Sequence, residues 1–361
     1  MPHPVSVAED DDVDTLNGRI ASVKLDEREE NPGRINRINP FAPYLENESL
    51  RFVDDLARTL IPKRLSGLQQ TRWLEINETC PIYVAGRKFQ IKYGISEASF
   101  QNWIKLLCGY LDFPVILLLN PSGFDVLEYE EMVQQSPTLL WLKDNLEILN
   151  LELRDVIVLD TFPMVTDGLS ESKKFAEDWS ELVADSFELT LTCLRYIRPQ
   201  ILISCQCCSK AINKRWGSFG DVRATELCSS EAGARQELVK KVNIYGHRML
   251  VVQGVHPQNV VQYNPKMEGI LKTLLTKVLG PFGQWKERRV TERREAAQRE
   301  VVLAQDGITN GMTVLLKQMD LFEQICRHKN EIELTVTVGR VKEWRKQIEN
   351  WAREMSGIEK V

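Results

Sequence analysis

The sequence has no long hydrophobic run, and this absence narrows the classes of protein to consider. Its longest uninterrupted apolar stretch, residues 115–119, is far shorter than the roughly 20 residues that a helix needs to cross a bilayer. The amino terminus also lacks the basic and then apolar pattern of a secretory signal. The sequence therefore predicts a soluble, intracellular protein with no membrane partner.

Several familiar catalytic and metal-binding patterns are absent as well. There is no P-loop, no H-E-x-x-H, no G-x-S-x-G and no EF-hand pattern, so neither nucleotide triphosphate nor metal chemistry is predicted. Cysteines cluster at Cys205-Gln206-Cys207-Cys208, but no second C-x-x-C or C-x-x-H pair completes a zinc site. The eight cysteines are predicted to be thiols, buried as small apolar side chains. We expect no metal ion and no cofactor.

Charge is distributed unevenly along the 361 residues. The net charge is -5, yet residues 1–30 alone hold nine acidic and three basic residues, a net charge of -6. Residues 1–45 are also polar and rich in proline, which predicts an acidic, disordered arm. The rest of the chain is nearly neutral, so charge neither requires nor forbids a polyanionic partner such as DNA.

Residues 46–280 alternate short apolar runs with amphipathic helical patterns. Four apolar runs typical of buried parallel strands lie at residues 115–119, 156–159, 201–203 and 249–252. Helical patterns lie between them, for example at residues 98–111 and 136–148. The alternation predicts a three-layer α/β fold, with a central four-stranded, mainly parallel sheet and helices on both faces.

Residues 281–361 are predicted to form a helical extension. A polar helix rich in arginine comes first, and two apolar stripes at helical spacing follow it. The stripes are Met312, Leu315, Met319, Phe322 and Cys326, then Val341, Trp344, Ile348, Trp351 and Met355. Such an extension either folds back on the body or binds a protein partner.

Polar side chains follow three of the four apolar runs. Asn120 follows the first run, Asp160 follows the second, and His256 lies just beyond the fourth. Open α/β sheets bind ligands at the carboxyl ends of their strands, so we expect these side chains to form a site. Asparagine and aspartate also begin ordinary loops. It is the convergence of the three residues that favours a site.

The same segments resemble the uracil-DNA glycosylase superfamily. They are Leu119-Asn-Pro-Ser-Gly123, the strand entry at Arg198-Pro199 and Val251-Val-Gln-Gly-Val-His-Pro257, in order within residues 65–280. The Asn-Pro pair is similar to the first motif of the mismatch-specific and single-strand-selective branches. The resemblance implies a nuclear, DNA-binding enzyme of base-excision repair. It would hydrolyse the N-glycosidic bond of a flipped-out uracil or other modified base, without a metal or covalent nucleophile.

The resemblance also implies roles for individual residues. His256 would donate a hydrogen bond to the departing base, and Asn120 would position the water or the base. Asp160 would read the base edge, and Phe124 or Phe162 would stack on the base unless core packing holds them. The residues expected to contact DNA are Ser122, Gln258, Asn259, Lys210, Lys214 and Arg215.

The sequence departs from the family at three positions, Leu118, Asp160 and Gln258. An ionised aspartate only accepts hydrogen bonds, so Asp160 would repel the carbonyl of uracil and favour an exocyclic amine such as that of cytosine. These departures leave a second hypothesis open, a catalytically inactive glycosylase fold that acts as a DNA- or protein-interaction module. An unrelated α/β hydrolase is disfavoured because no nucleophile and base occur together.

Overall fold

The computed structural model describes residues 50–68, 72–173, 177–206, 221–327 and 332–357. The acidic arm predicted at residues 1–45 lies outside these residues. No helix in the described ranges is both long and apolar enough to cross a membrane.

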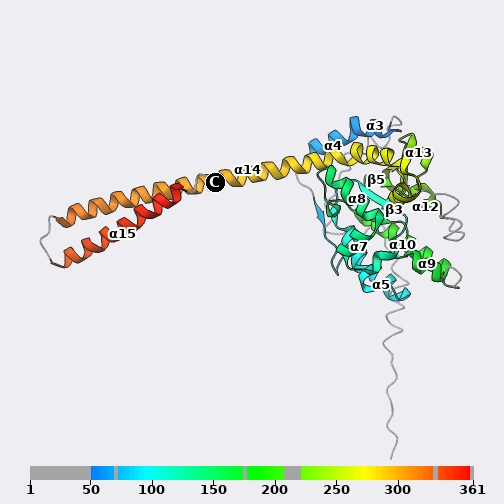
Figure 1. Ribbon diagram of the computed structural model, residues 1–361, viewed down its shortest axis with the longest axis horizontal. Coiled ribbons are helices and arrows are strands. Elements are labelled where there is room, and N and C mark those ends of the chain that lie inside the picture. Colours follow the sequence, from blue (N-terminus) through cyan, green and yellow to red (C-terminus); the bar gives the residue numbers. More distant parts are fainter. Residues whose placement is uncertain (1–49, 69–71, 174–176, 207–220, 328–331, 358–361) are drawn as a thin grey trace, which may run out of the picture. The chain divides into compact units, whose positions relative to one another are not determined.

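A five-stranded sheet with the order β4-β3-β5-β7-β6 lies at the centre of the α/β body (Figure 1). Four of its strands are parallel, namely β3 (Val115–Leu118), β4 (Val158–Asp160), β5 (Ile201–Ser204) and β7 (His247–Gln253). They correspond to the four predicted apolar runs. Every residue of β3, β4 and β5 is buried, which explains why these strands do not alternate with polar residues. A separate antiparallel pair joins β1 (Trp73–Leu74) to β2 (Gly109–Tyr110).

The prediction of a four-stranded sheet was wrong by one strand. β6 (Val239–Ile244) pairs antiparallel with β7, and the pairing leaves Tyr245 and Gly246 as a two-residue turn. Both turn residues have positive φ, 50° and 74°, as a two-residue hairpin favours. β6 is an edge strand in which Val239, Val242 and Ile244 are buried while the intervening residues are not. It therefore lacks the continuous apolar run by which the other strands were recognised.

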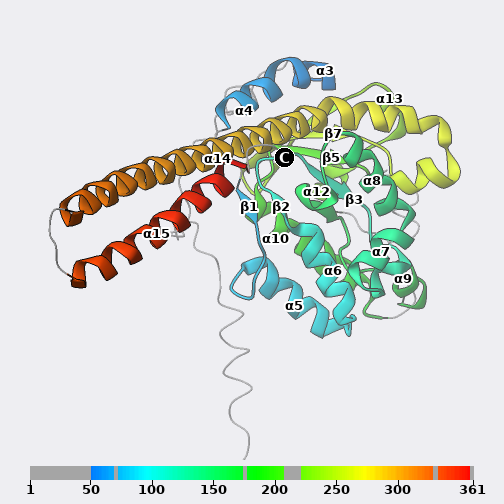
Figure 2. The ribbon, with the colours of Figure 1, turned by 60° about the vertical axis from the view of Figure 1, so that its left-hand side comes forward.

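Helices cover both faces of the sheet, as the sequence predicts (Figure 2). One face packs on α5 (Pro81–Tyr93), α6 (Glu97–Leu107), α10 (Trp179–Ile197) and α12 (Val222–Leu227). Their apolar side chains cluster with Val115, Leu117 and Leu202 of the strands. The alternate strand residues, such as Ile116 and Ile203, are also fully buried and belong to the opposite face. α8 (Pro137–Ile148) and the first turns of α14 (Glu268–Arg327) lie on that side.

Shorter elements complete the body. They are α3 (Val53–Asp55), the π-helix η1 (Leu56–Leu60), α4 (Ile61–Gly67), α7 (Tyr129–Gln135), α9 (Asp167–Lys173), α13 (Glu231–Arg235), the 3-10 helices η2 (Gly123–Val126), η3 (Leu153–Asp155) and η5 (Pro265–Met267), and the π-helix η4 (Asn259–Tyr263). Serine side chains cap the starts of helices: the Ser96 hydroxyl accepts from the Ser99 N–H before α6, that of Ser136 accepts from the Leu139 N–H before α8, and that of Ser230 accepts from the Gly233 N–H before α13. Pro137 at the first position of α8 fits a helix start.

α14 joins the body to the helical extension as one helix of 60 residues. Its first turns are part of the core, since Leu271, Leu275 and Phe282 are almost completely buried. Gly283 is required there, because a Cβ at this position would lie 1.7 Å from the carbonyl oxygen of Leu149. The predicted boundary between residues 280 and 281 thus falls inside a continuous helix. Further along, α15 (Ile332–Gly357) packs against α14 to form a helical hairpin (Figure 1).

Candidate functional site

Four polar side chains lie at the carboxyl ends of the four parallel strands. Asp160 ends β4, Asn120 follows β3, Gln206 follows β5 and His256 follows β7. Neighbouring strands are about 4.8 Å apart, so the four strand ends span about 14 Å. In the sheet order, β4 lies next to β3 on one side of the central β3–β5 pair, and β7 lies next to β5 on the opposite side. The chain therefore runs outward in opposite directions from β3 to β4 and from β5 to β7. Open α/β sheets bind ligands where the direction of crossing reverses in this way.

Asn120 is half-buried and fixes the chain that leads into α9. Its Nδ2 atom donates to the Val165 carbonyl at 3.3 Å and to Asp167 Oδ1 at 3.0 Å, and it lies 3.0 Å from the Pro121 carbonyl. Among the described residues, its Oδ1 atom has no hydrogen-bond partner. Asn120 therefore holds the Asp167 carboxylate while keeping one acceptor for a water or a ligand.

His256 is a neutral hydrogen-bond donor. The backbone N–H of Gln258 donates to its Nδ1 atom at 3.3 Å, which assigns the ring hydrogen to Nε2. Burial lowers the pKa of His256 to about 4, and the nearby negative charge of Asp167 opposes this only in part. At pH 7 the imidazole is therefore uncharged, and its Nε2–H is available to a ligand.

Asp167 is a site residue that the sequence analysis missed. It is half-buried at the start of α9, is hydrogen-bonded to Asn120 and is close enough to His256 to affect its pKa. The segment Thr166-Asp167-Gly168 has the composition of an ordinary helix start. No sequence pattern shows that it folds back to the end of β3.

Three other polar side chains near the strand ends are buried with unpaired atoms. Within the part of the chain that the structure describes, Asp125 Oδ2, Asp160 Oδ1 and both amide atoms of Gln206 have no hydrogen-bond partner. The loop that carries Asp125 is held by α6, where Ser99 Oγ and Asn102 Nδ2 donate to its carbonyl at 3.3 and 2.8 Å. A buried polar atom without a partner costs free energy. Such atoms concentrated at one edge of a sheet are typical of a ligand-binding site.

Burial changes the charge expected for the two acids. It raises the pKa of Asp125 to about 7 and that of Asp160 to about 8, and the charge of Asp125 contributes to the latter. A carboxyl with a pKa of about 8 is about nine-tenths protonated at pH 7. The expectation of an ionised Asp160 therefore does not agree with its burial. A protonated carboxyl both donates and accepts hydrogen bonds, so the argument for an exocyclic amine no longer holds.

The two candidate stacking aromatics differ in exposure. Phe162 is completely buried and packs against Phe187, with ring centroids 6.4 Å apart. Phe124 lies in η2 beside Asp125 and is 40% exposed. The structure thus places Phe162 in the hydrophobic core and leaves Phe124 as the accessible ring of the pair.

The residues expected to contact DNA are placed in part. Ser122 precedes η2 and is half-buried, as are Gln258 and Asn259 at the start of η4. Gln258 Nε2 donates to Gln262 Oε1 at 3.2 Å. The three basic residues of this set, Lys210, Lys214 and Arg215, lie outside the described residues.

No protein-family model matches this sequence, and no curated protein matches it. The resemblance to uracil-DNA glycosylases therefore rests on the residues of this chain alone. Across the described ranges, no three histidine, cysteine or carboxylate side chains are grouped to hold a metal ion.

Proposed function

We propose that this protein binds DNA and hydrolyses the N-glycosidic bond of a base that has rotated out of the duplex. The observation that carries this proposal is the grouping of Asn120, Asp167 and a neutral His256 at one edge of the sheet. The nuclear location expected from the sequence depends on the same proposal.

Each residue of the group has a role in this reaction. The bond between C1′ and the base nitrogen breaks, its electron pair leaves with the base, and positive charge develops on the sugar. The Nε2–H of His256 donates to the base atom on which negative charge gathers. The Asp167 carboxylate, held by Asn120, stabilises the positive sugar and orients a water molecule. The water oxygen then bonds to C1′, and Asp167 accepts the released proton.

A protonated Asp160 fits a uracil-type base and does not by itself select it over cytosine. Uracil presents a carbonyl next to a ring N–H, whereas cytosine presents an amine next to a ring nitrogen without hydrogen. A protonated Asp160 donates its O–H to the uracil carbonyl and accepts from the N–H, and with cytosine it would donate to the ring nitrogen and accept from the amine. Its unpaired Oδ1 atom is consistent with a hydrogen bond that only a bound base completes.

Base release from oligonucleotides tests the proposal. The full chain is incubated with single- and double-stranded DNA carrying uracil, deaminated purines, cytosine or mismatches. We expect release of uracil, and a loss of about 10²-fold or more in rate for His256→Ala and for Asp167→Asn. Asp306→Asn, which changes an exposed carboxylate on α14, is the matched control and should retain the full rate.

The pH dependence gives an independent check. Activity should be constant from about pH 5 to pH 7, because His256 stays neutral there, and should fall above about pH 8 as Asp160 ionises. If the reaction instead required a protonated histidine, the activity would fall as the pH rises from about 5 to about 7.

One observation favours a second function. The amide hydrogens of Asn120 go to acceptors of the protein itself, as in a residue that only holds a loop. The fold would then be a catalytically inactive module that binds DNA or protein. A wild-type chain that binds the oligonucleotides but releases no base would support this function and refute hydrolysis.

A further inference from the structure

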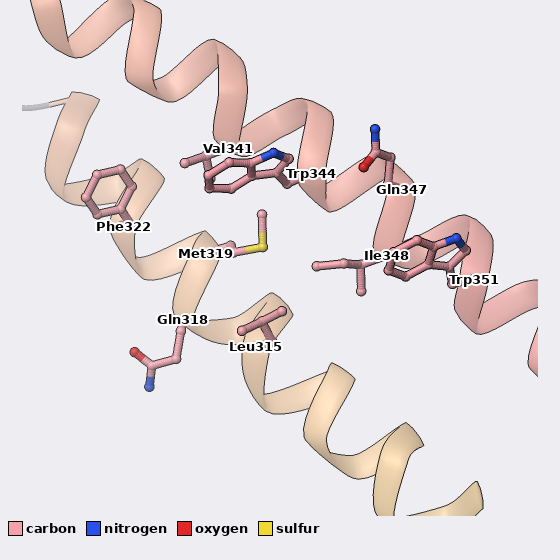
Figure 3. A pocket seen from close by; sticks show the side chains of 9 residues that line it. All are labelled: Leu315, Gln318, Met319, Phe322, Val341, Trp344, Gln347, Ile348 and Trp351. Atoms are coloured by element: carbon pink, nitrogen blue, oxygen red, sulfur yellow. The ribbon is translucent and has the colours of Figure 1, made fainter.

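The hairpin of α14 and α15 carries an open apolar groove that the proposed reaction does not use (Figure 3). The groove has a volume of about 460 Å³. Its lining residues are Leu315, Gln318, Met319 and Phe322 on α14, and Val341, Trp344, Gln347, Ile348 and Trp351 on α15. In the view of Figure 3 both tryptophan rings stand beside this groove.

The two helices cover only one side of their apolar stripes. Val341 is buried, but Trp344 and Trp351 are each 60% exposed and Leu315 is 49% exposed. The ion pair of Arg345 with Asp320 links α15 to α14, and neither residue lines the groove. Large contiguous apolar patches on soluble proteins mark interaction sites, so a further surface is expected to cover this groove.

The lining of the groove is uncharged and suits contact with itself. Among the described lining residues, the side-chain amides are those of Gln318 and Gln347, one on each helix, and the indole N–H groups of Trp344 and Trp351 are the other polar groups. A two-fold interface brings a patch against its own copy, and a charged patch would meet like charge there. An amide carries both donors and an acceptor, so glutamine can pair with glutamine. An acidic or basic peptide, in contrast, would find no opposite charge in the lining.

The exposed face continues along α14 toward its N-terminus, in the residues that precede Leu315. Ile308 is 51% exposed, and Gly307 and Gly311 flank it. These glycines are four residues apart on one side of the helix, and a Cβ at either would meet, among the described residues, no atom within 4 Å apart from its own helix backbone and chain neighbours. A second helix can therefore approach α14 closely along this stretch.

The size of the face matches that of a stable dimer. α15 has 26 residues and so is about 39 Å long. Two helices side by side are about 20 Å wide, which gives a face of about 800 Å². Specific interfaces between proteins bury about 800 Å² on each partner.

From these observations we propose that the α14–α15 hairpin docks on the hairpin of a second copy of this chain, forming a two-fold four-helix bundle. The apolar stripes of the two copies then face one another, and the glutamines lie at the edge of the shared core. None of the groove residues belongs to the candidate site at the carboxyl ends of the parallel strands. The dimer proposal is therefore independent of base hydrolysis.

The mass of the full chain in solution tests this proposal. Light scattering and sedimentation equilibrium should give twice the chain mass of 41.5 kDa for the wild type. Trp344→Glu together with Trp351→Glu should halve the mass without loss of helix content, because both side chains are exposed in the single copy. Ile148→Glu, at an apolar side chain of α8 that is 75% exposed, is the matched control and should remain dimeric.

A second variant separates a second copy from another occupant. Gln318→Lys with Gln347→Lys places like charges across the two-fold axis and should also halve the mass. A wild type with the mass of one chain at submillimolar concentration would overturn the proposal. So would a dimer that persists in both double variants.

Discussion

Replacing Asp160 by asparagine is the most direct test of the electrostatics inferred for the site. The substitution keeps the shape of the side chain and removes its titrating carboxyl. In the folded protein burial raises the pKa of this carboxyl to about 8, against 3.8 for the exposed group. Between these values the folded chain holds a proton that the unfolded chain releases.

The sign and size of the effect follow from this difference. The favourable contribution of Asp160 to the free energy of unfolding is complete below about pH 3.8 and is lost as the pH rises through about 8. The slope is about 1.4 kcal/mol per pH unit, so Asp160 accounts for a loss of about 3 kcal/mol between about pH 5 and pH 7. Asp125, with a pKa raised to about 7, adds a further decline that the variant retains.

Urea unfolding followed by circular dichroism at several pH values measures both curves. We expect the free energy of unfolding of Asp160→Asn to decline less steeply than that of the wild type, by the slope given above. Asp306→Asn should follow the wild-type curve, since its side chain is exposed. Parallel curves for wild type and Asp160→Asn would show that Asp160 is ionised in the folded protein and would refute the reasoning.

Two further predictions concern packing and the attachment of α14. Gly86→Ala should lower the free energy of unfolding by about 1–3 kcal/mol in urea titrations, because the added Cβ would lie 2.0 Å from the buried ring of Trp103. Gly269→Ala is its control, since a Cβ there has open space and should not lower the stability. Lys286→Met should cost about 1–3 kcal/mol by the same assay, since Lys286 Nζ lies 2.5 Å from the buried Asp155 carboxylate. Its control is Arg299→Met, an exposed residue whose nearest carboxylate oxygen is 3.9 Å away, and unchanged stability of Lys286→Met would contradict the prediction.

The main features of the fold could be predicted because a strand that is buried on both faces has a continuous run of apolar residues in the sequence. β3, β5 and β7 each contain an unbroken apolar run, which in β7 is residues 249–252, and Ser136-Pro137 marked the start of α8. β6 was missed because Lys240, Lys241 and Asn243 interrupt its apolar residues, as an edge strand allows. Its buried residues Val239, Val242 and Ile244 do not keep a strict period of two, so the pattern gave no clear strand signal.

The candidate site was only partly predictable. Asn120, Asp160 and His256 were identified because a strand end fixes the position of the residues that follow it. Asp167 and Asp125 were not predicted as site residues, because they lie in short elements whose placement depends on hydrogen bonds to residues distant in sequence. The charge of Asp160 was misjudged for a related reason: a pKa depends on how much protein surrounds the group, and sequence spacing does not report this.

Desolvation also connects the separate features of the site. The same removal of water that lowers the pKa of His256 raises those of Asp125 and Asp160, so at pH 7 the strand ends carry a neutral donor, His256, and a largely protonated Asp160. The half-buried Asp167, which is hydrogen-bonded to Asn120, supplies a carboxylate to the same edge of the sheet. A leaving base that gains negative charge requires uncharged or positive donors, and a sugar that becomes positive requires a carboxylate. In the proposed reaction, the neutral His256 and the protonated Asp160 meet the first requirement and the Asp167 carboxylate meets the second.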